Sequence, residues 1–190
     1  MAVRLLALCG SARQGSINAR LLALAVATAR ARGAEVTEFP LAANLLPLMD
    51  EDLETAQGLP PAAVQLKAAF AAHDGLLIGS PEYNGFFTPL LKNAIDWVSR
   101  PVPGQASPFA GKTAALFAAS TGTLGGIRGL PHLRLLLSNL GVTVAPGQMA
   151  LARADQAYGA DGRLADAGQQ AMLEKCIDDL LRLTAGLRAG

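Results

Sequence analysis

The chain has 190 residues, of which 51% are apolar and 16% are charged, and its formal net charge is +1. This length and composition predict a single domain, 1–190, with a large buried core. The near-neutral charge excludes the strongly basic surface of proteins that bind nucleic acid or an anionic membrane. No apolar run approaches the ~20 residues of a membrane span, and the N-terminal run is too short for a signal peptide, so we expect a cytoplasmic protein.

In chain order, short apolar runs alternate with stretches of helical periodicity. Strands are predicted at 3–9, 35–39, 75–79, 112–119 and 142–145. Helices are predicted at 17–32, 61–73, 88–99, 130–140 and 166–187. The irregular, proline-rich and acidic stretch 40–61 predicts a long loop beside a site. This alternation indicates an α/β fold with a parallel sheet and helices on both faces.

The apolar positions of the helices predict which faces are buried. The expected core residues are Ile17, Leu21, Leu24 and Thr28 in the first helix, Val64, Leu66 and Phe70 in the second, Leu90, Leu91, Ala94, Ile95 and Val98 in the third, and Leu173, Cys176, Ile177, Leu180 and Leu181 in the last.

The histidines and cysteines are isolated from one another. His73, His132, Cys9 and Cys176 show no metal-ligand spacing, so no metal site is predicted. Both thiols are expected to be reduced and buried, and a reactive thiol is the alternative.

Three polar, glycine-containing loops follow predicted strands, at 10–18, 80–89 and 119–129. Ligands of open parallel sheets bind beyond the carboxyl ends of the strands, near the point where the strand order reverses. We therefore expect these three loops to form the binding site.

The first loop, GSARQGSIN, joins a strand to a helix. The start of a helix offers free N–H groups and partial positive charge, which favour phosphate. Ser11, Ser16 and Asn18 can donate hydrogen bonds to phosphate oxygens, and Arg13 can add a charge-assisted one. Ordinary helix capping by Ser16 is the alternative.

The sequence of the first loop does not match either of two known phosphate-binding motifs. Gly10 and Gly15 match the glycines of GxxxxGK[ST], but Ser16 and Ile17 replace the lysine and the metal-binding hydroxyl. Ala12 replaces the second glycine of GxGxxG. We therefore expect a phosphate monoester that is bound without a metal.

The second loop, SPEYNGFFTP, concentrates aromatic residues. Gly85 permits positive φ or close approach to a flat ligand. Tyr83, Phe86 and Phe87 predict either a wall for an aromatic ring or a hydrophobic plug over the end of the sheet.

The third loop, ASTGTLGGIRG, combines glycines with the hydroxyls of Ser120 and Thr121. Its glycines expose backbone amides and leave room for a planar group, and a flexible connection is the alternative.

The segments GSARQGSIN and SPEYNGFFTPLLKNAIDW resemble the NAD(P)H-dependent FMN reductases of the flavodoxin-like superfamily, which include chromate- and quinone-reducing members. The resemblance extends from Val3 to about Val144. It implies a flavodoxin-like, doubly wound sheet of five parallel strands in the order 2-1-3-4-5. It also implies FMN at the carboxyl edge of the sheet, with NADPH or NADH as electron donor.

By position, the resemblance assigns a role to residues in each loop. The FMN phosphate would be bound by Ser11, Arg13, Ser16 and Asn18, with Gln14 and Gly15 as further neighbours. The ring and ribityl chain would be bordered by Pro81, Glu82, Tyr83, Asn84 and Gly85. The pyrimidine end of the ring would be approached by Ser120, Thr121, Gly122 and Gly125.

The resemblance further implies a homodimer or homotetramer, with the helix 89–99 at the dimer contact. Trp97 would be a contact residue or, equally, a core aromatic. Glu82 is expected to hold its loop or to meet a neighbouring subunit. Arg13, Arg100 and Arg128 are candidates for the 2′-phosphate of NADPH.

The expected enzyme takes hydride from NAD(P)H and passes electrons to a quinone, free flavin or similar small acceptor. Because the flavin supplies the redox chemistry, no catalytic side chain of the protein is expected. One alternative is a flavodoxin-like electron carrier without its own NAD(P)H oxidase activity. Another is a nucleotide-sensing module that takes up no flavin.

Overall fold

The computed structural model describes residues 2–189. Five parallel strands form one sheet in the order β2-β1-β3-β4-β5. The strands are β1 (Arg4–Cys9), β2 (Glu35–Phe39), β3 (Gly75–Gly79), β4 (Thr113–Ala119) and β5 (Thr143–Leu151). The predicted parallel sheet and the implied strand order are both confirmed.

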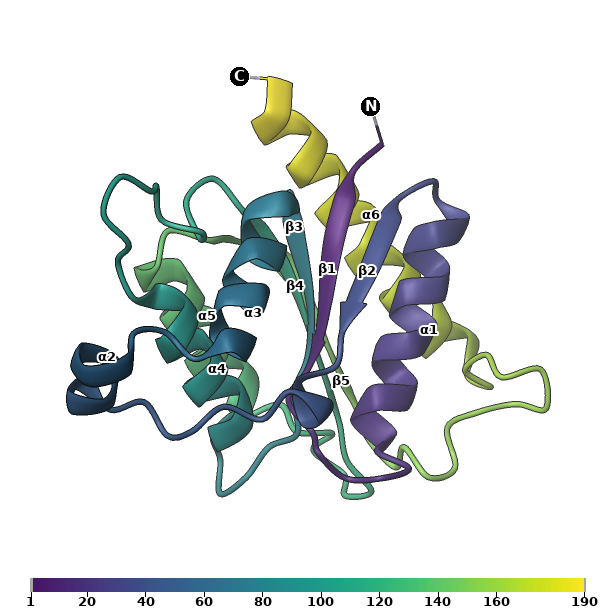
Figure 1. Ribbon diagram of the computed structural model, residues 1–190. Coiled ribbons are helices and arrows are strands. Elements are labelled where there is room, and N and C mark those ends of the chain that lie inside the picture. Colours follow the sequence, from purple (N-terminus) through teal and green to yellow (C-terminus); the bar gives the residue numbers. More distant parts are fainter. Residues whose placement is uncertain (1, 190) are drawn as a thin grey trace.

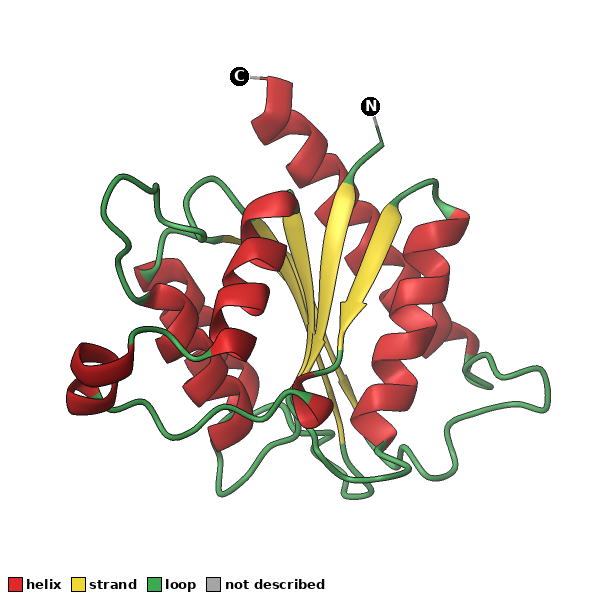
Figure 2. Cartoon of the chain, in the orientation of Figure 1, coloured by secondary structure: helices red, strands yellow, loops and turns green. Residues whose placement is uncertain are grey.

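Helices cover both faces of the sheet (Figure 1). One face carries α1 (Ile17–Ala31) and α6 (Ala167–Ala189). The other face carries α3 (Pro61–Ala72), α4 (Pro89–Ser99) and α5 (Gly129–Asn139). Figure 2 shows the resulting three layers, with the sheet enclosed between helices. None of the helices within residues 2–189 combines the length and apolar character that crossing a bilayer requires.

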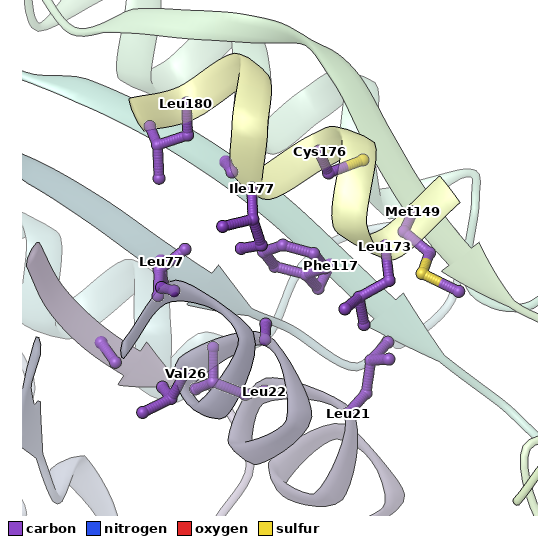
Figure 3. Packing of buried hydrophobic residues seen from close by; sticks show 14 of the residues in the cluster. Leu21, Leu22, Val26, Leu77, Phe117, Met149, Leu173, Cys176, Ile177 and Leu180 are labelled. Carbon is purple, nitrogen blue, oxygen red and sulfur yellow. The ribbon is translucent and has the colours of Figure 1, made fainter. Parts of the chain in front are cut away.

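The core beneath α1 and α6 joins these helices to the central strands (Figure 3). Phe117 of β4 and Leu77 of β3 are fully buried there against Ile177 of α6. Cys176 lies in the same cluster, and burial raises the pKa of its thiol to about 11. Both cysteines are free. Cys9, the last residue of β1, is only partly buried, so the prediction that both thiols are buried was wrong for Cys9.

The buried face of α1 differs from the predicted stripe. Leu21 is buried as expected, whereas Ile17, Leu24 and Thr28 are only partly buried. The helix instead buries Asn18, Leu21, Leu22, Ala25, Val26 and Ala29. The prediction weighted large apolar residues, but small alanines let α1 approach the sheet and α6 closely.

The face of α3 also differs from its prediction at one position. Leu66 and Phe70 are buried, but Val64 is 51% exposed, so its assignment to the core was wrong. Lys67 is buried instead, and its ammonium donates to the carbonyl oxygens of Val98, at 3.1 Å, and of Arg100. These hydrogen bonds satisfy the ammonium group of Lys67, a side chain whose polarity alone would predict exposure to solvent.

The stretch 40–61 is not one continuous loop. It contains the short helices η1 (Leu41–Ala43) and α2 (Glu51–Gln57). Asp50 caps α2 by accepting from the Asp52 amide at 2.8 Å, and the acidic cluster fills the first turn. Carboxylates stabilise this positive end of a helix, so the cluster that was predicted as loop starts a helix.

The last strand is longer than predicted. β5 extends beyond 145 to Leu151, and its register with β4 shifts between the pairs of Ala114 and Leu116. Pro146 lies at this irregularity and cannot donate to the ladder, which explains why the strand signal ends there.

Candidate functional site

Three loops converge at the carboxyl edge of the sheet, the lower edge in Figure 1. Segments 10–16, 80–88 and 120–128 follow β1, β3 and β4, which are neighbouring strands. All fifteen sequence-predicted binding residues therefore lie at this edge, either on these loops or, for Asn18, in the first turn of α1.

The first loop presents hydrogen-bond donors and no acid. Ser16 is the N-cap of α1, with its Oγ accepting from the Ala19 amide at 3.3 Å, so it does cap the helix. Its own hydroxyl hydrogen is still free to donate to an anion. The first turn of α1 holds no acidic residue, and its amides lack intrahelical acceptors. Arg13 is exposed and takes part in none of the ion pairs among residues 2–189.

A tight contact joins the first loop to the second. The Thr88 hydroxyl donates to the carbonyl oxygen of Gly10 at 2.6 Å, and the Gly10 amide donates to Gly79 at 2.8 Å. A Cβ at Gly10 would lie only 2.7 Å from the Thr88 Oγ1. Position 10 therefore requires glycine, because the Thr88 side chain packs directly against the backbone of the first loop.

The second loop turns at Asn84 and Gly85, whose φ angles are 54° and 83°. The Tyr83 amide donates to the Phe86 carbonyl oxygen at 2.8 Å, and the Phe86 amide donates to the Tyr83 carbonyl oxygen at 3.1 Å. Two central residues with positive φ between such a pair are typical of a type I′ turn, which favours Asn-Gly. The positive φ expected at Gly85 is confirmed.

The aromatic residues of the second loop divide between two roles. Phe87 is buried and forms a hydrophobic plug over the end of the sheet. The alternative prediction, that it forms a wall for an aromatic ring, was wrong for this residue. Tyr83 and Phe86 are 52% and 45% exposed. Phe86 stacks on His132 of α5, with ring centroids 4.4 Å apart, and this contact holds the aromatic edge beside the third loop.

A buried side-chain amide joins α1 to the third loop. Asn18 is 3% exposed, its Nδ2 donates to the carbonyl oxygen of Ala119 at 2.8 Å, and its Oδ1 accepts from the Ala119 amide at 2.8 Å. The side chain is thus engaged by the end of β4, 101 residues away along the chain. Sequence reasoning treated Asn18 as a phosphate ligand and missed this contact.

An ion pair joins the second loop to the third. Glu82 Oε2 accepts from the Arg128 amide at 2.9 Å, and Oε1 accepts from the Arg128 Nε at 2.7 Å. Burial acts to raise the pKa of the Glu82 carboxyl, but the bonds and charge of Arg128 outweigh it and lower that pKa. Of the two roles expected for Glu82, this geometry agrees with holding the loop.

The third loop is anchored on β5 and is not a free connection. A Cβ at Gly125 would lie 2.7 Å from the carbonyl carbon of Ala150, and the Arg153 amide donates to the Gly122 carbonyl oxygen at 3.1 Å. Gly125 is therefore required by packing on β5. The surroundings of Gly122 are open, because a Cβ there would meet only the Ser120 Oγ, at 3.6 Å.

Two residues expected near a ligand or a partner lie elsewhere. Arg100 caps the far end of α4, where its Nε donates to Glu54 at 2.6 Å, so it is distant from the three loops. Trp97 is fully buried, and its Nε1 donates to the Pro47 carbonyl oxygen at 2.8 Å. Of the two expected roles, Trp97 is the core aromatic.

Comparison with known proteins identifies the family that shares this arrangement. The family described as NADPH-dependent FMN reductase matches residues 3–156. The chain is a member of this family. It is 36% identical over 180 residues to an NAD(P)H-dependent FMN reductase of Pseudomonas aeruginosa, covering 94% of this chain and 93% of that protein.

Two further proteins are similar to this chain. A quinone reductase of Escherichia coli K12 is 37% identical over 135 residues, covering 71% of this chain and 69% of that protein. The solved structure of FerB, a flavoenzyme NAD(P)H:(acceptor) oxidoreductase from Paracoccus denitrificans, has a TM-score of 0.81 at 28% identity. The superposition covers 97% of this chain and 98% of FerB.

Membership confirms the class of protein that the two motifs indicated. The chain is a flavin-dependent oxidoreductase of the FMN reductase and quinone reductase type, with FMN as cofactor and NAD(P)H as electron donor. The hypothesis of an enzyme is thereby favoured over the hypotheses of an electron carrier and of a nucleotide sensor.

Proposed function

We propose that the three loops bind FMN with its phosphate in the first loop and its ring against the second and third. The observation that carries this proposal is the acid-free cluster of donors formed by Ser11, Arg13, Ser16 and the first turn of α1. Such a cluster fits a dianionic phosphate monoester. The Asn18 side chain is not included among the phosphate ligands, because it is already hydrogen-bonded to the backbone of Ala119.

The remaining predicted residues fit the rest of the cofactor. Bound FMN supplies the transfer of hydride and electrons, so the chain contributes binding and orientation. In the second loop, Pro81, Asn84 and Gly85 present a rigid turn beside exposed Tyr83. In the third loop, exposed Thr121 and Gly122 present backbone amides that can donate to a ring carbonyl oxygen and stabilise negative charge there. Gln14 and Gly15 border the phosphate.

The second substrate is proposed to enter over the same exposed edge. Tyr83, Phe86, Leu124 and Ile127 are exposed apolar residues on the second and third loops. Because the charge of Glu82 is neutralised by Arg128, this rim favours flat, uncharged acceptors such as quinones or the ring of free flavin. Relatives named as quinone reductase and FMN reductase support these acceptor classes.

Three finer assignments belong to the proposal. Arg13 and Arg128 remain candidates for the 2′-phosphate of NADPH, whereas Arg100 does not. A homodimer or homotetramer is proposed from the resemblance. A cytoplasmic location also belongs to the proposal.

Reduction of bound flavin tests the proposed function. Purified apoprotein is mixed with FMN, and NADPH or NADH is then added without oxygen. The expected result is uptake of FMN, bleaching of its visible absorbance by either donor, and recovery of that absorbance when a quinone is added. Failure to take up FMN, or uptake without bleaching by either donor, would contradict the proposal.

A further inference from the structure

We infer that Asn18 is a positioning residue that couples the phosphate-binding turn to the loop beside the flavin ring, an inference that rests on the proposed FMN site. Asn18 lies in the first turn of α1, two residues after the N-cap Ser16 of the first loop. Its partner Ala119 ends β4, and Ser120 begins the third loop directly after it. One side chain therefore links the two ends of the proposed cofactor site.

The position of Ala119 explains why an amide is needed there. β3 ends at Gly79, which pairs with Phe117, and the Ser80 amide still donates to the Phe117 carbonyl oxygen at 2.9 Å. Beyond that point β3 supplies no partner for Ala119, while β5 pairs with β4 on the other side through Leu151. The Asn18 amide takes the place of the missing peptide group, giving one donor and one acceptor to Ala119.

Loss of this contact would leave polar groups of Ala119 unpaired in a buried place. Ala119 is 2% exposed and belongs to the core cluster beneath α1. An unsatisfied buried amide or carbonyl is unfavourable, so the strand end would shift towards water and carry the third loop with it. The ring-binding loop would then lose its position relative to α1.

Replacement by aspartate gives a variant whose effect depends on pH. In Asn18→Asp, one oxygen still accepts from the Ala119 amide, but an ionised second oxygen faces the Ala119 carbonyl oxygen with no proton between them. The neutral acid restores that donor. Burial and the facing carbonyl both favour the neutral form, so the pKa of the new carboxyl is expected above its ordinary value. Lower pH should therefore restore ligand binding.

Riboflavin and FMN together separate positioning from direct phosphate contact. Dissociation constants for both ligands are measured by quenching of flavin fluorescence in the native protein and in Asn18→Asp, from about pH 5 to pH 8. A positioning role predicts that both ligands bind about tenfold more weakly to the variant near pH 8 and recover as the pH falls. Because riboflavin has no phosphate, its recovery reports the carboxyl at position 18.

The native protein supplies the pH baseline. Cys9 and Tyr158 are partly buried neighbours of the same core cluster, and burial raises the pKa of both, so both stay protonated over this range. Arg20 stacks on Tyr158 and keeps its charge throughout. The riboflavin profile of the native protein, which includes any effect of His132 stacked on Phe86, is therefore subtracted from the profile of Asn18→Asp.

Asn93→Asp is the matched control. The Asn93 side chain likewise accepts from a backbone amide, that of Met49 at 2.8 Å, and donates to a carbonyl oxygen, that of Pro47 at 2.8 Å. These bonds hold the segment 46–49 on α4 and involve no residue of the three loops. This variant should lose stability but keep both flavin affinities within about twofold of the native values.

The outcomes are distinct. If the native protein binds FMN but Asn18→Asp binds riboflavin with native affinity at all pH values, the positioning role is overturned. If only FMN binding weakens, Asn18 is a direct phosphate ligand. If the native protein does not bind FMN, the proposed function itself fails. If Asn18→Asp does not fold, Asn18→Ser, which carries a short uncharged hydroxyl, is measured in its place. A positioning role predicts that Asn18→Ser binds both riboflavin and FMN more weakly than the native protein at every pH.

Discussion

The carboxylate of Glu82 is bonded to both the backbone and the guanidinium of Arg128, and it thereby joins two loops 46 residues apart. Two comparable contacts, Gly10 with Thr88 and Asn18 with Ala119, join the other pairs of loops. The three proposed binding loops are therefore connected pairwise by the protein itself. A site that is organised in this way loses less conformational entropy when its cofactor binds.

Removal of the Arg128 side chain should loosen the second and third loops. The Glu82 side chain is only 8% exposed, so Arg128→Ala leaves a buried carboxylate that is bonded to backbone amides alone. Because Arg128 is itself largely exposed, we expect the free energy of unfolding to fall by roughly 1–2 kcal/mol. Urea denaturation checks this value, and FMN titration should show weaker binding.

Arg163→Ala is the control, because it breaks an exposed ion pair with Glu174 of α6 that involves no residue of the three loops. Its expected loss is below about 1 kcal/mol, with FMN affinity unchanged. Equal losses of stability and of FMN affinity in the two variants would show that the Glu82 pair has no special role.

Acid should remove the advantage that Arg128 confers. The lowered pKa of Glu82 means that its contribution to stability is complete above the ordinary glutamate range and is lost as the pH falls through the lowered value. The native protein and Arg128→Ala should therefore differ most near neutral pH and converge in acid. Urea denaturation across this range tests the sign, and a difference that grows in acid would contradict it.

Alanine at position 10 should force the first two loops apart. The new Cβ would lie 2.7 Å from the Thr88 Oγ1, which is closer than real contacts allow. We expect Gly10→Ala to lower the free energy of unfolding by about 1–3 kcal/mol and to weaken FMN binding.

Gly186→Ala makes the same chemical change in an open part of α6, where no atom lies within 4 Å of the new Cβ. It should raise stability by about 0.5–1 kcal/mol, because alanine favours a helix over glycine. If Gly10→Ala behaved like Gly186→Ala, the close approach of Gly10 to Thr88 would be refuted.

The buried thiol of Cys176 should resist alkylation. Its pKa of about 11 leaves almost no thiolate at pH 8, and the side chain is fully buried. Iodoacetamide should therefore label Cys176 only after denaturation, and peptide mass mapping can follow the reaction. Rapid labelling of Cys176 in the folded protein would show that this part of the core opens readily.

The sequence predicted those features that depend on local patterns. Strand β3 ends at the glycines that bound its apolar run, and Thr88 followed by Pro89 marks the start of α4. Local patterns failed where packing decides. Val64 fits an apolar stripe but faces water, and Pro146 interrupts the signal of a strand that continues to Leu151.

The candidate site shows the same division. The three loops were predicted from the strands that precede them, and the family comparison confirms the cofactor that the motifs implied. The bonds of Asn18 to Ala119 and of Glu82 to Arg128 connect residues far apart in the chain. No spacing in a single sequence indicates such partners, because they meet only when parallel strands align their carboxyl ends.

The central claim is that the first loop holds the phosphate of FMN, and a comparison of FMN with riboflavin tests it directly. Dissociation constants for both ligands are measured in the native protein and in Arg13→Ala, which removes an exposed cation of that loop. The account predicts that the native protein prefers FMN and that Arg13→Ala loses about tenfold in FMN affinity, while its riboflavin affinity is unchanged. Equal affinity of the native protein for the two ligands, or an equal loss for both in Arg13→Ala, would contradict it.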